Sequence, residues 1–443
     1  MADAGMVYRL DDRPPGRRAF VLAVQHALTM FGSTVAIPLL FGPALWPVDG
    51  DAERSVQLAQ RAVQSQNIAI LISSVMLCSG LATFLQSTFG SRLPIIQGVS
   101  FSFIAPFFAI IGACGARGEG GATMMQYIAG AILTGAVIEA VVGFSGLMGW
   151  IRRILSPVVV GPVIMLIGLA LFQHGAPKAG TYWPISGLTI FLIILFSFVL
   201  ARRRRLFRLF PILLAIVISC GVCWILSAVG LFDAGHPAHV LLAPVHDAAW
   251  LRVDPREVVL PWGAPRFELR FIIAVFAGYL ASMIESFGDY HACSNMAGAG
   301  DPSPRQISRG IGFEGVGCAL TGVFGGFSST SYSENIGLIG LTRVGSRFVV
   351  QIAAVILIAM GLFGKFGAIA ATIPGPVVGG LYCSLFGLIS AVGIQQLAKA
   401  DLSSNRNLFI AGFSLFMGLS VPAYFSAVGD VGDIQVPGQM WAI

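Results

Sequence analysis

The sequence predicts an all-α protein that crosses a lipid bilayer many times. Of its 443 residues, 56% are hydrophobic and only 11% are charged, and the mean hydropathy is +0.82. Soluble domains carry about 25% charged residues, so this much apolar surface must face lipid or other membrane helices. Apolar runs of about 18 or more residues, enough to cross a hydrocarbon core, recur along nearly the whole chain. The composition therefore excludes a soluble protein.

Thirteen apolar segments are predicted as membrane spans. The tenth is too short to cross a bilayer alone. The 54 glycines are typical of close helix packing and of broken membrane helices. The predicted spans are 19–41, 67–87, 94–113, 123–147, 155–172, 185–201, 210–231, 270–292, 309–325, 333–344, 348–368, 376–397 and 407–424.

Polar, β-prone strings interrupt the third and tenth spans. They are Gln97–Ser102 and Ser328–Ser333. Extended backbone within a membrane is tolerated only where protein buries it or where it lines a polar cavity. We therefore expect a short strand in each of these two spans, beside such a cavity.

The basic residues predict a cytoplasmic N-terminus. Cytoplasmic loops of membrane proteins carry an excess of Lys and Arg. With this orientation most short basic loops lie in the cytoplasm, and the acidic segment 49–53 and the long loop 232–269 lie outside. Because the loops account for the net charge of +6, that charge does not indicate a nucleic-acid partner. We expect a multi-pass protein of the plasma (inner) membrane.

A weak similarity between two segments of the sequence predicts an inverted repeat. Pro157–Val163 opens the fifth span and the similar string Pro374–Gly380 opens the twelfth. The two polar interruptions also fall at corresponding places in the two halves. Each pair is seven spans apart, and an odd number of spans reverses the direction across the membrane. Paired broken helices in an inverted repeat indicate a substrate site near the bilayer midplane, as in many secondary transporters.

Two acids in the eighth span are candidates for binding an ion. An acid inside an apolar span costs roughly 2.5–3.5 kcal/mol on insertion scales, so its presence there indicates a structural or functional role. Glu285 and Asp289 are four residues apart, which places both carboxylates on one helical face. The pair suits a cation, or a proton that binds and leaves. The alternative is a hydrogen-bonded pair near a helix end.

Four other side chains are candidates with a structural alternative. Glu334 opens the tenth span and either satisfies free N–H groups there or accepts N–H donors of a planar heterocycle. Carbonyl oxygens of such a ligand would meet the free N–H groups of that helix end. His26 and Glu314 are either packing and pairing residues or ion-coupling residues, and Phe101 offers a wall for a flat ligand.

The segment Glu334–Arg343 matches a known signature, Gln/Glu/Pro-Asn-x-Gly-x-x-x-x-Thr-Arg/Lys/Gly. Its defined positions are Glu334, Asn335, Gly337, Thr342 and Arg343. Gln25-His26, Gly98–Phe101 and Glu285 occur around it in the same order as in the family. Over essentially its whole length the sequence resembles the nucleobase-ascorbate transporter family, also called nucleobase:cation symporter-2.

The resemblance implies fourteen spans in two inverted seven-span repeats, with short strands in spans three and ten. It also implies a homodimer in which a core domain moves against a gate domain. This chain shows thirteen spans and ends at Ile443, where the fourteenth should begin. The expected divisions are a cytoplasmic N-terminus 1–18, core 19–147, gate 148–231, extracellular loop 232–269, core 270–372 and gate 373–443.

The resemblance also assigns expected roles within the site. Phe101 would stack on a nucleobase, and Glu285 and Glu334 would accept its N–H groups, with the backbone at Ser333 contributing. The candidates for ion coupling are Glu285, Asp289, His26 and Glu314. No cofactor or metal is expected.

Proton-coupled uptake of a nucleobase, uracil first, is the function that we expect. A Glu at the first position of the signature, as at Glu334, resembles the uracil-transporting branch of the family, and a carboxylate can only accept N–H bonds. Asp289 departs from that branch, in which His is typical at this position. The alternatives are sodium-coupled transport of a nucleobase or ascorbate, and a channel or anion exchanger of similar fold. No motif indicates an enzyme.

Overall fold

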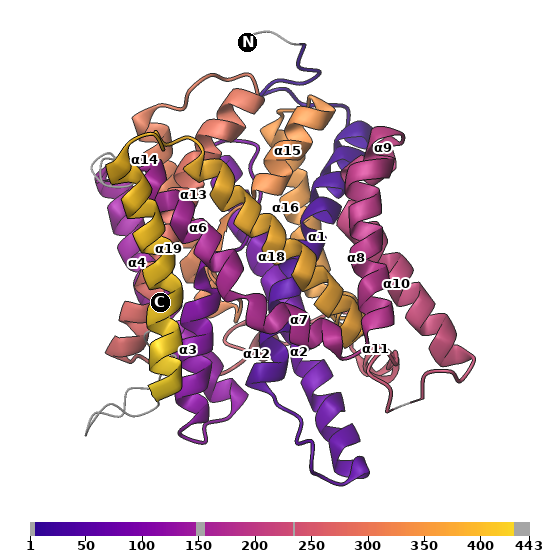
Figure 1. Cartoon of the computed structure of the whole chain (residues 1–443). Coiled ribbons are helices and arrows are strands. Elements are labelled where there is room, and N and C mark those ends of the chain that lie inside the picture. Colours follow the sequence, from indigo (N-terminus) through magenta and orange to yellow (C-terminus); the bar gives the residue numbers. More distant parts are fainter. Residues whose placement is uncertain (1–4, 148–155, 234, 429–443) are drawn as a thin grey trace.

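Long apolar helices make up most of the computed structural model, which describes residues 5–147, 156–233 and 235–428 (Figure 1). Within these ranges nine helices are long and apolar enough to cross a membrane. A helix lies at every predicted span, so the predicted helical membrane fold is confirmed. The segment 429–443, where a fourteenth span would begin, lies outside the described residues.

The first half of the chain contains the elements up to α10. Their bounds are α1 Gly16–Leu45, α2 Arg54–Thr88, β1 Gln97–Val99, the 3₁₀ turn η1 Phe101–Phe103, α3 Ile104–Gly115, α4 Gly121–Ser145, α6 Pro157–Ala170, α7 Phe172–Gly180, α8 Trp183–Ile194, η2 Leu195–Val199, η3 Leu200–Arg202, α9 Arg205–Leu209 and α10 Pro211–Ala228.

Two short helices, α11 Ala243–Asp247 and α12 Pro255–Val258, lie in the long loop that follows. The remaining elements are α13 Leu269–Met296, α14 Pro304–Val323, β2 Ser329–Ser331, α15 Ser333–Thr342, α16 Arg347–Leu362, α17 Gly364–Ala371, α18 Gly375–Leu397 and α19 Asn405–Val428.

Two helices differ from the predicted spans in extent. Helix α2 begins at Arg54, well before the predicted start at residue 67. Its first turns are rich in Gln, Ala and Arg, which favour helix but are too polar for a search based on apolar runs. The fifth span also continues past its predicted end at residue 172, because α7 follows α6 directly and reaches Gly180.

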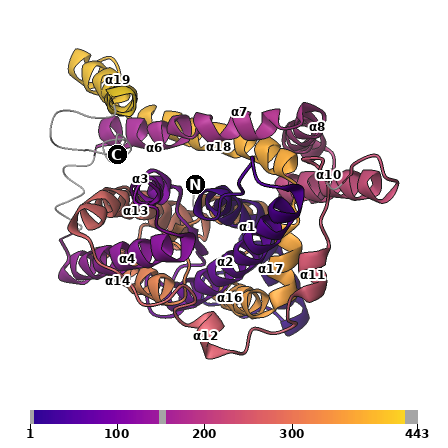
Figure 2. The same cartoon turned by 90° about the horizontal axis from the view of Figure 1, so that it is seen from below.

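The helices lie in two groups (Figure 2). One group contains α1 to α4, α13, α14, α16 and α17, and a row of α6, α7, α18 and α8 crosses one side of it. Contacts between the groups include a hydrogen bond of 3.1 Å from Tyr382 Oη to the carbonyl of Ala36. The rings of Phe108 and His174 also stack across the boundary, with centroids 4.3 Å apart.

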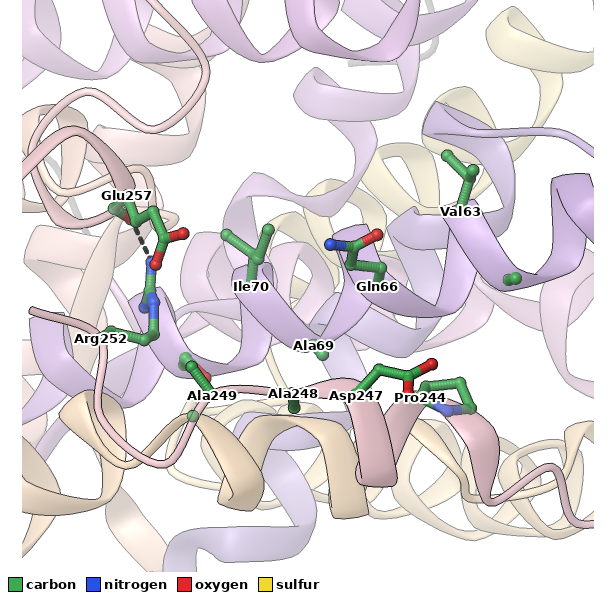
Figure 3. Close-up of a pocket in the computed structure, with 13 residues that line it drawn as sticks. Val63, Gln66, Ala69, Ile70, Pro244, Asp247, Ala248, Ala249, Arg252 and Glu257 are labelled. Carbon is green, nitrogen blue, oxygen red and sulfur yellow. Dashed lines mark hydrogen bonds between the residues drawn. The ribbon is translucent and has the colours of Figure 1, made fainter. Parts of the chain in front are cut away.

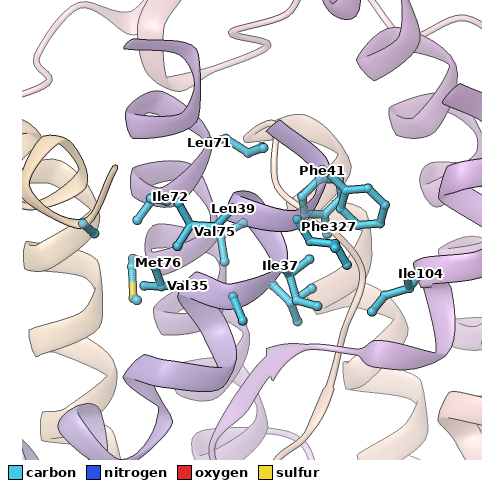
Figure 4. Packing of buried hydrophobic residues seen from close by; sticks show 14 of the residues in the cluster. Val35, Ile37, Leu39, Phe41, Leu71, Ile72, Val75, Met76, Ile104 and Phe327 are labelled. Atoms are coloured by element: carbon cyan, nitrogen blue, oxygen red, sulfur yellow. The ribbon is translucent and has the colours of Figure 1, made fainter. Parts of the chain in front are cut away.

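Helix α1 is enclosed by protein in its second half (Figure 4). Val35, Ile37 and Phe41 are all at most 2% exposed, although they lie on different faces of the helix. A helix that is apolar all round belongs in a core and not at a lipid-facing surface. The Phe41 ring lies 4.9 Å from that of Phe327, in the loop before β2. This packing ties α1 to the loop that leads into β2.

The two short strands pair with each other inside the bundle. Strands β1 and β2 are antiparallel, with Gln97 opposite Ser331 and Val99 opposite Ser329. Two further backbone bonds, Ser100 N to Ser328 O and Tyr332 N to Ile96 O, extend the ladder at 3.0 Å each. All six strand residues are buried. The predicted strands in spans three and ten are therefore confirmed, and each satisfies the backbone of the other.

Replacing Gly98 with Ala should destabilise the strand pair. A Cβ atom at this position would lie 2.4 Å from the Tyr332 ring, and the Tyr332 hydroxyl is held by a 3.0 Å bond to the carbonyl of Val99. We expect overpacking to lower the free energy of unfolding by about 1–3 kcal/mol. Thermal unfolding of the purified protein in detergent measures the change.

The matched control is Gly387→Ala in α18, where nothing lies within 4 Å of the added methyl group. That variant should unfold at the temperature of the unchanged protein or above it, because Ala favours helix more than Gly does. Equal melting temperatures for the two variants would contradict the predicted clash at Gly98.

Candidate functional site

Two helical segments begin at the strand pair. Strand β1 runs into η1 and α3, and β2 runs into α15. Because the strands are antiparallel, these segments leave from opposite ends of the pair and their N-termini face its centre. Free N–H groups at a helix N-terminus favour electron-rich ligand atoms. Phe101 and Ser333 are the first residues of η1 and α15, so the strand pair brings these two predicted site residues to its two ends.

Helix α13 supplies two of the predicted acids beside the start of α15. Asp289 is 9% exposed and accepts hydrogen bonds from Ser331 Oγ at 2.9 Å and Ser333 Oγ at 2.8 Å. Glu285, one turn earlier, is partly buried and receives no hydrogen bond from a described residue. It interacts electrostatically with Asp289, Glu334 and Glu314. Glu285 therefore keeps both oxygens available for a ligand.

Helix α15 supplies the third acid. Glu334 lies in its first turn, is partly buried, and accepts a hydrogen bond of 3.1 Å from Ser33 Oγ of α1. Phe101 is also partly buried, whereas Ser333 is exposed. The structure thus brings Glu285, Asp289, Ser333 and Glu334 together around one end of the strand pair.

Glu314 lies behind this group and is 1% exposed. Its carboxylate accepts hydrogen bonds from Tyr290 Oη at 2.6 Å, Ser286 Oγ at 2.7 Å and Ser282 Oγ at 3.3 Å. Ser286 Oγ also lies 3.0 Å from Ser331 Oγ, and Ser331 is bonded to Asp289. Hydroxyl groups therefore link Glu314 to the acids of α13.

His26 contacts the signature motif. The amide of Asn335 donates to the carbonyl of His26 at 3.0 Å and lies 3.2 Å from its Nδ1 atom. His26 is 2% exposed, and no hydrogen bond in the described part of the chain joins it to an acid.

The rest of the signature shapes α15. Thr342 Oγ1 donates to the carbonyl of Leu338 at 2.8 Å, and Arg343 ends α15 in a left-handed conformation with φ of 57°. At Gly337, by contrast, nothing lies within 4 Å of an added Cβ atom. The described residues contain no group of three or more His, Cys, Asp and Glu that could hold a metal ion.

Comparisons with known proteins show the family of this chain. The sequence profile of a family described as "Permease family" matches residues 17–427. Solute carrier family 23 member 2 of Rattus norvegicus is 38% identical, over 95% of this chain and 68% of that protein. Nucleobase-ascorbate transporter 2 of Arabidopsis thaliana is 36% identical, over 95% and 80%. The chain belongs to the nucleobase-ascorbate transporter family. It is a multi-pass membrane transporter and not an enzyme.

A solved structure shares the fold of this transporter. The transmembrane domain of a cyanobacterial bicarbonate transporter, BicA, superposes with a TM-score of 0.57 over 93% of this chain and 97% of that one. The two sequences are only 15% identical, so this likeness supports the fold alone.

Several polar residues of the candidate site were not predicted from the sequence. Ser282, Ser286 and Tyr290 all bond Glu314, and they are spaced four residues apart on one face of α13. That spacing is visible in the sequence and predicts a polar stripe. The partner of the stripe is not visible, because Glu314 lies on a different helix.

A cavity of about 370 Å³ lies apart from the predicted site residues (Figure 3). It is bounded by α2, the long loop and Gly364, and Gln66 of α2 points into it. Arg252 lines this cavity at 6% exposure and bonds the carbonyl of Glu257 and, at 3.4 Å, Ser74 Oγ. Burial lowers the pKa of the Arg252 guanidinium. None of the predicted site residues lines this cavity.

Replacing Asn335 with Ala should destabilise the transporter, because it removes the donor to the buried carbonyl of His26. The carbonyl keeps its helical bond within α1, so the loss of this one hydrogen bond should cost about 0.5–1.5 kcal/mol in free energy of unfolding. The measurement is thermal unfolding in detergent, with Asn295→Ala as the matched control. Asn295 makes an exposed bond of 3.0 Å to Asp301, so its loss should change stability by less than about 0.5 kcal/mol. A control variant that melts as early as Asn335→Ala would refute the assigned contact.

Proposed function

We propose that this transporter carries a nucleobase, uracil in the first place, together with a proton by secondary active symport. One observation carries the proposal: two intramembrane carboxylates, Glu285 and Glu334, lie within electrostatic range of each other at the strand pair. Glu285 receives no hydrogen bond from a described residue, and Glu334 receives one from Ser33 Oγ and one from its own backbone N–H. A ligand with N–H groups would give Glu285 the donors that it lacks and would add a donor to Glu334.

The chemistry of uracil fits these groups. Its ring N–H groups would donate to Glu285 and Glu334, since a carboxylate only accepts hydrogen bonds. Its carbonyl oxygens would accept from backbone N–H groups at the start of α15, near Ser333. The Phe101 ring is available for stacking on the flat face of the base.

An anionic substrate fits the site less well. Plant relatives carry ascorbate as well as nucleobase in their names. A site that presents two carboxylates would repel an anion such as ascorbate. Glu285 and Glu334 therefore favour a nucleobase, and they equally disfavour an anion channel or exchanger.

Sodium is the second candidate for the coupled ion, on the basis of Asp289. Its carboxylate and the hydroxyls of Ser331 and Ser333 gather three oxygen-bearing side chains at one point. Oxygen ligands of this kind suit hard cations. The other candidates for ion coupling are Glu285, His26 and Glu314. We propose a proton bound within this set of residues in preference to sodium at Asp289.

Transport would occur by alternating access. We assign 19–147 and 270–372 to a core that carries the site, and 148–231 with 373–443 to a gate that forms a dimer with a second copy. The two helix groups of Figure 2 support this division. Both strands also fall within the residues assigned to the core, which supports it further. The repeated Pro-rich strings support an inverted repeat. The arginine-rich loops support a plasma-membrane protein with a cytoplasmic N-terminus.

Replacing Glu285 or Glu334 with Ala should abolish uracil uptake without removing the protein from the membrane. Each change removes a charged hydrogen bond worth about 1.5–3 kcal/mol, or roughly 10- to 100-fold in affinity. The measurement is uptake of radiolabelled uracil by cells that lack their own carriers, normalised to surface expression. Glu53→Ala, at an exposed position before α2, is the control and should transport normally. Normal uptake by either site variant would refute the assignment.

The same uptake assay identifies the ion and the substrate. We expect uptake to be independent of sodium and to be lost when a protonophore is added. Unlabelled uracil should inhibit uptake more strongly than xanthine, guanine or ascorbate. A requirement for sodium would instead select Asp289 as the ion site. Stronger competition by xanthine or ascorbate would overturn uracil as the substrate.

A further inference from the structure

Glu139, in the second half of α4, has no role in the site described above. Its side chain is 0% exposed, and neither carboxyl oxygen has a hydrogen-bond partner among the described residues. Burying an ionised carboxylate without donors is strongly unfavourable. An isolated charge at this position would therefore have no source of stabilisation.

Close contact between α4 and α14 places Glu139 against a second acid. Added Cβ atoms at Gly143 and Gly315 would lie 2.1 Å and 2.5 Å from backbone atoms of the facing helix. Small residues at such positions let two membrane helices approach closely. The result is that Glu139 interacts electrostatically with Glu314 and contacts the Cys318 side chain.

The two acids differ in their supply of hydrogen-bond donors. Glu314 accepts from three hydroxyls, those of Ser282, Ser286 and Tyr290. Glu139 accepts from none in the described part of the chain. Donors that point at a carboxylate stabilise its charged form, whereas a carboxyl without donors is stabilised by keeping its proton. Negative charge therefore belongs on Glu314 and the proton on Glu139.

Glu314 also connects this pair to the predicted substrate site. Ser286 Oγ donates to Glu314 at 2.7 Å and lies 3.0 Å from Ser331 Oγ, which donates to Asp289. A change of charge at Glu314 would reorient these hydroxyls. The charge on Glu314, at the contact between α4 and α14, is thereby linked to Asp289 of α13 next to the strand pair.

The titratable groups around Glu139 are one acid and three neutral side chains. Electrostatic contacts come from Glu314 and Cys318 of α14 and from Tyr279 and Tyr290 of α13. No described group of α1 or α3 makes such a contact, His26 and Cys114 included. Glu314 is thus the acid that the charge of Glu139 depends on.

We propose that Glu139 and Glu314 together hold the coupled proton, with Glu139 as a proton-carrying residue outside the substrate site. In the loaded state the pair has one proton, on a Glu139 oxygen, and one negative charge. The proton passes to a Glu314 oxygen and from there to water when the site opens to the cytoplasm, and the water that enters supplies the donors that ionised Glu139 lacks in the closed packing described here. A metal cation is disfavoured because it needs several oxygen ligands, which Glu139 does not have. The proposal rests on the proposed symport.

Infrared spectroscopy of the purified full chain in lipid tests the proton without any substrate. At neutral pH the unchanged protein should show a deuterium-sensitive band of a protonated carboxyl group that Glu139→Gln lacks. The control Glu53→Gln changes an exposed acid in the same way and should keep the band. An identical carboxyl band in the unchanged protein and Glu139→Gln would mean that Glu139 is ionised, which overturns the proposal.

Transport by proteoliposomes tests the coupling. Glu139→Gln should exchange uracil at equilibrium as the unchanged protein does, but it should lose accumulation driven by a proton gradient. Glu139→Asp should restore that accumulation, which a merely structural role would not require. Proton-driven accumulation by Glu139→Gln, or accumulation driven only by sodium, would overturn the proposal. If the unchanged protein moves no uracil, the proposed function fails, and the infrared result still decides whether Glu139 carries a proton.

Discussion

The backbone pairing of β1 with β2 is the interaction on which the rest of the structure depends. Extended backbone has no internal hydrogen bonds, and a membrane interior offers no water to replace them. Residues 97–99 and 329–331 satisfy each other instead. This pairing fixes where η1 and α15 begin and thus where Phe101, Ser333 and Glu334 lie. It also requires the Tyr332 ring to lie against Gly98, where no side chain fits.

Around this pair the buried acids are distinguished by the donors that reach them. Asp289 and Glu314 each accept from two or more hydroxyls. Glu285 and Glu139 accept from none among the described residues, but for different reasons. Glu285 is partly exposed beside the strand pair, so a ligand can reach it. Glu139 is sealed between α4 and α14, where only a proton satisfies it. Donor supply is thus a more direct guide to the role of each acid than its position in the sequence.

The sequence predicted the parts of the fold that depend on hydropathy and local pattern. All thirteen spans contain helix, and the polar strings Gln97–Ser102 and Ser328–Ser333 contain the strands, because a polar run in an apolar span has few structural solutions. The start of α2 at Arg54 was missed because helix formation there does not depend on apolar residues. The four-residue spacing predicted Glu285 and Asp289 on one helical face, and the family resemblance implied that Glu285 and Glu334 share one site. The bonds of Glu314 to α13 and the isolation of Glu139 were not, since both depend on how separate helices pack.

The strand pair also determines when the transporter can complete its structure during synthesis. Strand β1 is made long before its partner, since more than half of the chain lies between them. Until residues 329–331 emerge, the backbone of 97–99 has no ladder to join, and contacts between such distant segments form slowly. The third span therefore cannot complete its backbone hydrogen bonds while the intervening helices are being made. The centre of the molecule can thus form only late in synthesis, after both halves of the site have been made.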